Sequence, residues 1–158
     1  MPPSDPLRLQ ALNRFETVLN TIEAGDDYFY TPHKVSKHPI SYELAKNGPL
    51  YMVFTGEEGG PIDFAGTDLY DEKFTVSVQG IVFDRADLVS KLEKAIRDIR
   101  KAINDDSKSG AAGSLGVLAH QTIAERSPEI GYFSADKDDF AVFEQKYQVT
   151  VSGDFGEL

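Results

Sequence analysis

The feature that most constrains the fold is an alternating strand that leads directly into an amphipathic helix. Residues 74–83 place apolar side chains on one face, since successive side chains of a strand point to opposite sides. Asp84 and Asp87 follow as candidate N-caps of a helix that ends near Ile103. Its apolar side chains recur every three or four residues, at Leu88, Leu92, Ile96, Ile99 and Ile103. A helix with one apolar face has to cover a sheet or another helix.

A second amphipathic helix is predicted over residues 5–23. Asp5 is the expected N-cap, Pro6 fits the first helical position, and Gly25 is expected to end the helix. The apolar stripe consists of Leu12, Phe15, Leu19 and Ile22. This helix therefore also needs an apolar partner surface.

The remaining apolar segments predict a small sheet. Further strands are expected within residues 28–35, 50–54, 115–124 and 140–151. Residues 39–47 fit either a loop or a single helical turn. The order of elements predicts an α+β fold, with a mixed or antiparallel sheet of four to five strands and the two amphipathic helices packed on one face. The other face of the sheet would then need cover from loops or from another subunit.

Long polar connections are expected between these elements. They occupy residues 56–72, 104–114 and 127–139, and a short acidic tail covers 152–158. The length of 158 residues suits one domain, so a single domain is expected over residues 1–158. The N-terminal residues lack the basic start and apolar run of a secretory signal, and no apolar run approaches the roughly 20 residues that span a bilayer.

Charge is distributed unevenly along this acidic chain, whose formal net charge is −10. Residues 56–72 contain six acidic side chains and no basic one, whereas residues 85–103 contain six basic and three acidic side chains. The basic helix is either a solvated surface with i,i+4 ion pairs or a patch that meets an acidic patch on a neighbouring copy. The net charge argues against nucleic-acid binding, which requires clustered Lys and Arg.

Residues with catalytic or metal-binding chemistry do not gather in the sequence. The chain has no Cys, which excludes a thiol nucleophile and a disulfide scaffold. His33, His38 and His120 are scattered, and nothing local brings them to one metal ion. Paired aspartates such as those at 105–106 are typical of solvated turns. We therefore expect no cofactor, no metal site and no enzymatic activity, although an enzyme could still assemble a site from distant segments.

Aromatic side chains in the predicted loops and strand edges are candidate partner contacts, because Tyr and Phe are enriched at the centres of interfaces. These candidates are Tyr30, Phe64, Tyr70, Tyr132 and Phe133. Packing in the core is the competing interpretation for each of them.

The layout as a whole resembles a known family. A helix ends in Ile22-Glu23-Ala24-Gly25, a Pro-led strand follows at residues 49–53, and the long strand continues into the helix that begins near Asp87. A glycine-bearing loop and the closing strand at 140–151 complete the pattern. The chain resembles the tail terminator, or tail completion, proteins of long-tailed bacteriophages. The resemblance extends over nearly the full length and is one of pattern and size.

This resemblance implies a structural virion protein, made in the host bacterial cytoplasm. It would form a ring, expected to be a hexamer, at the head–tail interface on top of the tail. The ring would stop polymerisation of the tail tube protein and present a joining surface to a head-side neck or stopper protein. DNA would cross the lumen without specific binding, and no membrane is involved. The alternatives are a neck or stopper protein of the same virion and a small cellular protein-binding domain.

The charge map offers a hypothesis for the ring contact. A ring closed by head-to-tail contacts uses two different patches of each subunit. The basic patch would contain Lys94, Arg97 and Lys101. The acidic patch on the next subunit would contain Glu57, Glu58, Asp63 and Asp68.

Overall fold

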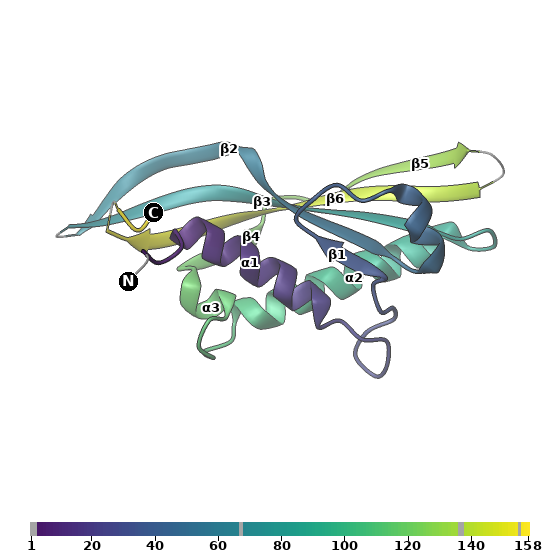
Figure 1. Cartoon of the computed structure of the whole chain (residues 1–158), viewed down its shortest axis with the longest axis horizontal. Coiled ribbons are helices and arrows are strands. Elements are labelled where there is room, and N and C mark those ends of the chain that lie inside the picture. Colours follow the sequence, from purple (N-terminus) through teal and green to yellow (C-terminus); the bar gives the residue numbers. More distant parts are fainter. Residues whose placement is uncertain (1–2, 67, 136–137, 155) are drawn as a thin grey trace.

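The structure is a computed structural model that describes residues 3–66, 68–135, 138–154 and 156–158; the side chains of residues 57–61, 63, 135 and 138 lie outside the described part. A six-stranded mixed sheet forms one layer and the helices form another (Figure 1). The strands are β1 (Lys34–Ser36), β2 (Leu50–Gly66), β3 (Leu69–Phe83), β4 (Gln121–Ala124), β5 (Glu129–Ala135) and β6 (Asp138–Gly153).

The sheet is built around β6, which pairs with three strands. The order is β1-β2-β3-β6-β4, and β5 also pairs with β6. Among the strand pairs of the described residues, only β1–β2 is parallel; β2–β3, β3–β6, β4–β6 and β5–β6 are antiparallel. The prediction of a mixed sheet with helices is therefore confirmed in outline, but the predicted count of four to five strands is too low.

The main core lies between the sheet and the two long helices, α1 (Leu7–Asn20) and α2 (Leu88–Ser107). The predicted stripes are buried there: Phe15 and Leu19 of α1 and Leu92 and Ile99 of α2 are fully buried. They pack with the sheet residues Tyr51, Val76, Val78, Phe143 and Val149. Figure 1 shows both helices on the same side of the sheet.

The helix ends follow the sequence signals unevenly. Asp87 caps α2 as predicted, and its side chain accepts a hydrogen bond from the Ser90 amide at 3.2 Å. Asp5 does not cap α1: Pro6 occupies that position without a side-chain cap, and the helix ends at Asn20 with Thr21 as its C-cap, before the predicted end near Gly25. The predicted Tyr28–Tyr30 strand is also absent, and the first strand is limited to Lys34–Ser36.

Two of the three predicted loops are largely regular structure, and the third, predicted at 104–114, is a loop over 108–114. Residues 56–66 and 69–72 belong to the β2–β3 hairpin, residues 129–135 form β5, and α2 continues to Ser107. The predicted strand at 115–124 is divided into the helical turn α3 (Leu115–Leu118) and β4. The expected acidic tail begins late, since β6 extends to Gly153.

The sheet face opposite the helices is covered at one end and polar elsewhere. The 3₁₀ helix η1 (Tyr42–Asn47) lies over a second small cluster that includes Leu50, Met52 and Ile81. Beyond it, the strands present Thr75, Ser77, Glu144 and Lys146, which line a polar depression. Thr75 and Ser77 are buried but donate hydrogen bonds to Glu125 and Glu144, and Glu144 and Lys146 are partly exposed. Because these polar groups are satisfied or reach water, this part of the sheet face does not by itself require a second subunit as cover.

Candidate functional site

The tip of the β2–β3 hairpin, here defined as residues 62–66 and 68–70, exposes apolar side chains at one end of the molecule (Figure 1). The exposed fraction is 44% for Ile62, 67% for Phe64 and 46% for Leu69. The rings of Phe64 and Tyr70 meet edge to face, with centroids 5.6 Å apart. Exposed apolar groups gathered at a loop end are typical of an interaction surface.

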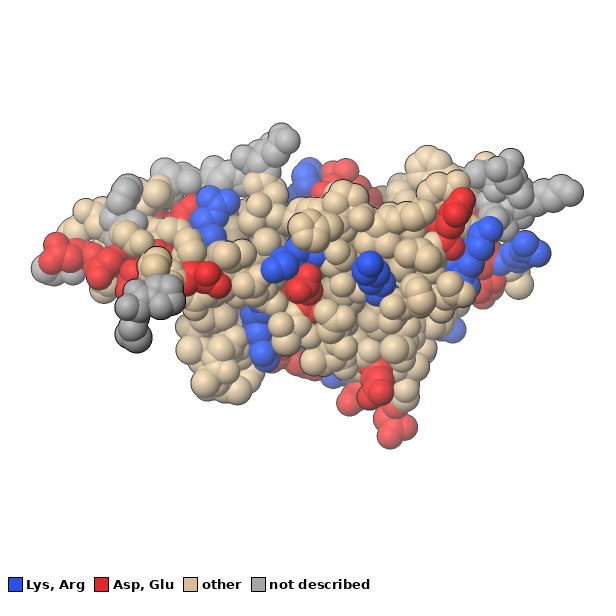
Figure 2. Space-filling model, in the orientation of Figure 1, with Lys and Arg blue, Asp and Glu red and all other residues tan. Residues whose placement is uncertain are grey.

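The β2–β3 tip is also acidic. Asp68 is exposed in the turn with a φ of 60°, and Asp71 accepts a hydrogen bond from Ser152. Figure 2 shows acidic side chains gathered at this end of the molecule. Glu57, Glu58 and Asp63 belong to β2 by their backbone, but their side chains lie outside the described residues.

A second exposed aromatic surface lies at the opposite end, on β5 (Figure 1). Tyr132 is 52% exposed and Phe133 is 51% exposed, and as neighbours in a strand they point to opposite sheet faces. Phe133 begins a stack of rings over the η1 face: its centroid lies 5.3 Å from that of Phe140, which also stacks on Phe83 and Tyr42. The aromatic candidates are therefore divided between the two ends.

The basic side chains of α2 have a structural partner that the sequence did not indicate, namely the loop at residues 26–31. Lys94 and Arg97 lie over the Phe29 ring, 5.3 and 5.4 Å from its centroid. Lys101 lies 5.6 Å from the Tyr28 centroid and pairs with Asp105 at 2.6 Å. The predicted interface cations are thus partly engaged in stabilising their own chain through cation–π contacts.

The anchor of this loop is Asp98, a fully buried carboxylate on α2. One of its oxygens accepts hydrogen bonds from the Phe29 amide at 2.8 Å and the Tyr30 amide at 3.0 Å. The other oxygen lies 3.3 Å from the Arg97 guanidinium. Tyr30, an aromatic candidate, is consequently half-buried against the core with Lys91 over its ring. Its predicted role as a partner contact is therefore not favoured by its position.

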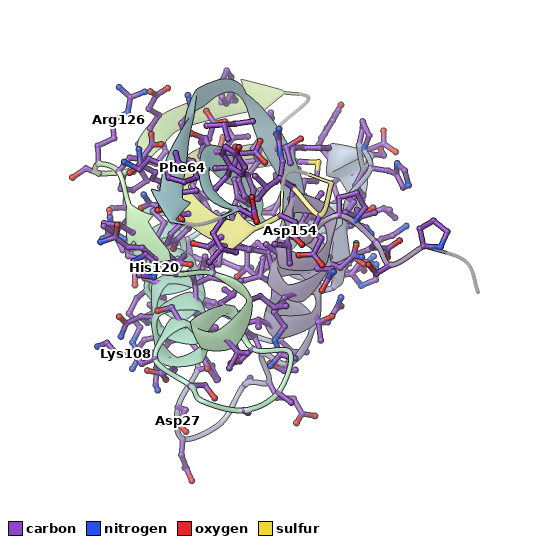
Figure 3. The ribbon with its side chains drawn as sticks, turned by 90° about the vertical axis from the view of Figure 1, so that its left-hand side faces the viewer. Asp27, Phe64, Lys108, His120, Arg126 and Asp154 are labelled. Atoms are coloured by element: carbon purple, nitrogen blue, oxygen red, sulfur yellow. The ribbon has the colours of Figure 1, made fainter. Side chains whose placement is uncertain are left out.

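A groove of about 590 Å³ separates α2 from the edge strand β4. Its basic lining comes from Arg97, Arg100 and Lys101 of α2. The opposite side is formed by Thr122 and Ala124 of β4, and its apolar lining includes Ile96, Ile103 and Tyr147. Figure 3 views the molecule from the end that carries the β2–β3 tip, with His120 and Arg126 labelled just before and after β4.

Two buried hydroxyl groups border this groove without a hydrogen-bond partner among the described residues, those of Thr122 and Tyr147. Tyr147 is only 4% exposed. Burial raises the pKa of the Tyr147 hydroxyl, an effect that the nearby Arg100 guanidinium partly opposes. The hydroxyl is therefore protonated at neutral pH. Arg100 is held in place by Gln145, whose side-chain oxygen accepts from the guanidinium at 3.0 and 3.2 Å.

The histidines do not converge. His33, His38 and His120 are all exposed, and the described residues contain no group of three or more potential ligands that could hold a metal ion. None of the helices in the described part of the chain is long and apolar enough to cross a bilayer.

Sequence reasoning identified several components of these surfaces without their arrangement. The structure brings Phe64 and Tyr70 together at the β2–β3 tip, as noted above, and places Arg97 and Lys101 at the groove. It does not bring the basic side chains of α2 to the tip of the same chain. Asp98, Tyr147 and Thr122 were not among the candidate residues predicted from the sequence. For Asp98, the available sequence signal was the aromatic run Tyr28-Phe29-Tyr30 together with a helix rich in basic side chains, which can contact aromatic rings. In comparisons with known proteins, no family model matches the chain, and no curated protein sequence shows a significant match to it.

Proposed function

We propose that this protein is a structural subunit that assembles with copies of itself into a ring at the top of a bacteriophage tail. In that position it would end polymerisation of the tail tube and offer a joining surface to the head. The observation that carries this proposal is the β2–β3 tip, where Phe64 and two further large apolar side chains are exposed at the extremity of an elongated molecule. Exposing such side chains to water is unfavourable, and a protein contact would bury them.

The second end of the molecule supports contacts of another kind. Tyr132 and Phe133 lie on β5, far along the sheet from the β2–β3 tip. A ring subunit in a tail needs lateral contacts with its copies and axial contacts with the tube and the neck. Two exposed apolar surfaces at opposite ends would provide for both classes of contact. We assign the tip to lateral contacts and β5 to an axial partner.

Native mass spectrometry and electron microscopy of the purified protein test the proposal. The expected result is a closed ring, with six copies as the first expectation, at high protein concentration or on tail tubes assembled from the tube protein of the same phage. Rings at one end of tubes of uniform length would support a terminator. Binding to the head portal assembly but not to tubes would favour the stopper alternative, and a protein that stays monomeric under all these conditions would contradict both.

A further inference from the structure

The β2–β3 tip cannot bury its apolar side chains within its own chain. Tyr70 at the tip pairs with Gly153 of β6, whereas the groove is bordered by Tyr147 of the same strand. These two positions on β6 are six residues apart, or roughly 20 Å along an extended strand. From Tyr70 the hairpin continues away from the groove. The exposed Phe64 ring therefore needs a surface from another molecule to become buried.

The α2–β4 groove has the properties of a surface that could bind such a hairpin. Apolar side chains contribute to its lining, and the Thr122 and Tyr147 hydroxyls beside it lack partners in the described part of the chain. Buried hydroxyl groups are almost always hydrogen-bonded in a complete structure. The β4 strand ends the sheet order, so its outer edge also lacks a strand partner among the described residues. An incoming hairpin would supply apolar side chains and main-chain polar groups together.

Charge complementarity favours the β2–β3 tip as the segment that binds in the α2–β4 groove. The groove is lined by three basic side chains and one acidic side chain, that of Glu93. The β2–β3 tip lies within the segment 56–72, which contains six acidic side chains and no basic one, and two of the six, Asp63 and Asp68, belong to the tip itself. Opposite charges on two surfaces steer association and disfavour the reversed pairing. The tip matches the groove in both its acidic and its apolar character.

We propose that the β2–β3 tip of one copy docks into the α2–β4 groove of a neighbouring copy, with the Phe64 ring as its apolar anchor. The tip and the groove are different surfaces, so the contact is head-to-tail and generates a ring when the rotation closes. This inference rests on the proposed function, because it takes a second copy as the occupant. It also amends the charge hypothesis: Arg97 and Lys101 belong to the groove, whereas Lys94 stays with the loop at residues 26–31.

Disulfide trapping tests the contact directly, because the chain contains no Cys. Ala65→Cys, which leaves the Phe64 ring in place, and Ala124→Cys are prepared as separate, differently tagged single variants, mixed and oxidised. Both positions are exposed, and Ala124 lines the groove. We expect the 65–124 cross-linked pair to form at least tenfold faster than a control pair of Ala65→Cys with Val89→Cys. Val89 is 56% exposed and does not line the groove. Equal rates for the two pairs would overturn the proposal.

Additional measurements separate the possible failures. Circular dichroism establishes that each single variant is folded, and Leu69→Cys replaces Ala65→Cys if the latter is not. If the unmodified protein forms rings and the 65–124 pair shows no preference, the docking contact is wrong and the proposed function stands. If the unmodified protein remains monomeric at several hundred micromolar and on tube ends, both are wrong. Ala124→Trp, which occupies the groove, is expected to weaken ring formation at least tenfold.

Discussion

At the scale of single residues, the fold depends on a few positions where a substitution either leaves buried hydrogen-bond donors without an acceptor or adds an atom for which there is no space. Asp98 is one, since its buried carboxylate organises the loop at residues 26–31 through two backbone amides. Gly80 is another, because it lies directly opposite Phe143 in the β3–β6 pair. In both cases the requirement comes from residues distant in the sequence.

Replacing Asp98 with Ala is expected to lower the free energy of unfolding by about 2–4 kcal/mol, because two amides lose a charged acceptor inside the protein. Urea unfolding measures this loss, and hydrogen exchange at the Phe29 and Tyr30 amides should accelerate locally. Asp105→Ala is the matched control on the same helix, where the side chain is half exposed and pairs with Lys101. Equal losses for the two variants would contradict the anchoring role of Asp98.

Gly80→Ala is expected to destabilise the protein by about 1–3 kcal/mol through overpacking. A Cβ atom at this position would lie 2.2 Å from the Cε1 and Cζ atoms of Phe143, so the ring or the strand has to move. Thermal and urea unfolding measure the effect. Gly25→Ala is the control, because a Cβ there would meet nothing within 4 Å. A stable Gly80→Ala protein would mean that Phe143 relaxes without loss of packing.

At the scale of elements, the helical layer is joined by one ion pair. The Arg14 guanidinium of α1 donates two hydrogen bonds to Asp106 of α2, at 2.8 and 3.1 Å, and the Leu115 amide of α3 donates a third at 2.9 Å. Burial raises the pKa of the Asp106 carboxyl, but these hydrogen bonds lower it by more, so the pKa lies below its ordinary value. The charged form is therefore the one that the folded state stabilises.

This arrangement predicts a specific loss of stability in acid. Because the pKa is lowered on folding, the contribution of Asp106 is complete above the ordinary aspartate pKa of about 4 and is lost as pH falls through the lower folded-state value. Asp106→Asn should cost about 1–2 kcal/mol at pH 7, a figure reduced by the partial exposure of Arg14. Urea unfolding from pH 7 to pH 3 should show the difference from the unmodified protein shrinking in acid. Asp26→Asn, at an exposed position, should show no such convergence.

The elements that were predicted correctly have undisturbed periodicity. The α2 stripe is regular and buried, and the apolar face predicted for the strand at 74–83 lies in the main core. The other face of that strand is also mostly buried, including Thr75 and Ser77, which the alternating pattern did not predict. The outer part of β2 was missed because its pairing with β3 shifts register between Thr55 and Gly59 and again before Ile62, which removes the two-residue alternation. Pro61 is compatible with β2 because β1 pairs only with Leu50–Met52, so this part of the outer edge needs no amide donor.

At the scale of the whole molecule, charge and exposed apolar area are separated along the sheet. The acidic β2–β3 tip occupies one end of the molecule and the aromatic side chains of β5 occupy the other. In the sequence, the basic helix α2 comes after the β2–β3 tip and before β5. Such a molecule offers different surfaces to different neighbours, as a head-to-tail assembly requires. Its contacts should also weaken with added salt where they are electrostatic.

Phe64→Ser is expected to reduce assembly strongly while leaving the melting temperature of the monomer nearly unchanged, because the side chain is largely exposed in one copy. Analytical ultracentrifugation over a concentration series measures the first effect and calorimetry in dilute solution the second. Val89→Ser removes a comparably exposed apolar side chain elsewhere and should leave assembly intact. If both variants assemble like the unmodified protein, the β2–β3 tip is not an interface.

The sequence by itself determined the two amphipathic helices, the central strand and the uneven charge, because each is encoded by residues close together in the chain. Only the tertiary structure decided that residues 56–66 and 69–72 belong to a hairpin, that a buried aspartate fastens the loop at residues 26–31, and that a groove lies between α2 and β4. These features depend on pairing and packing between distant segments. Local periodicity carries no information about which distant groups will meet, so the surfaces on which a partner would act emerge only when the chain is folded.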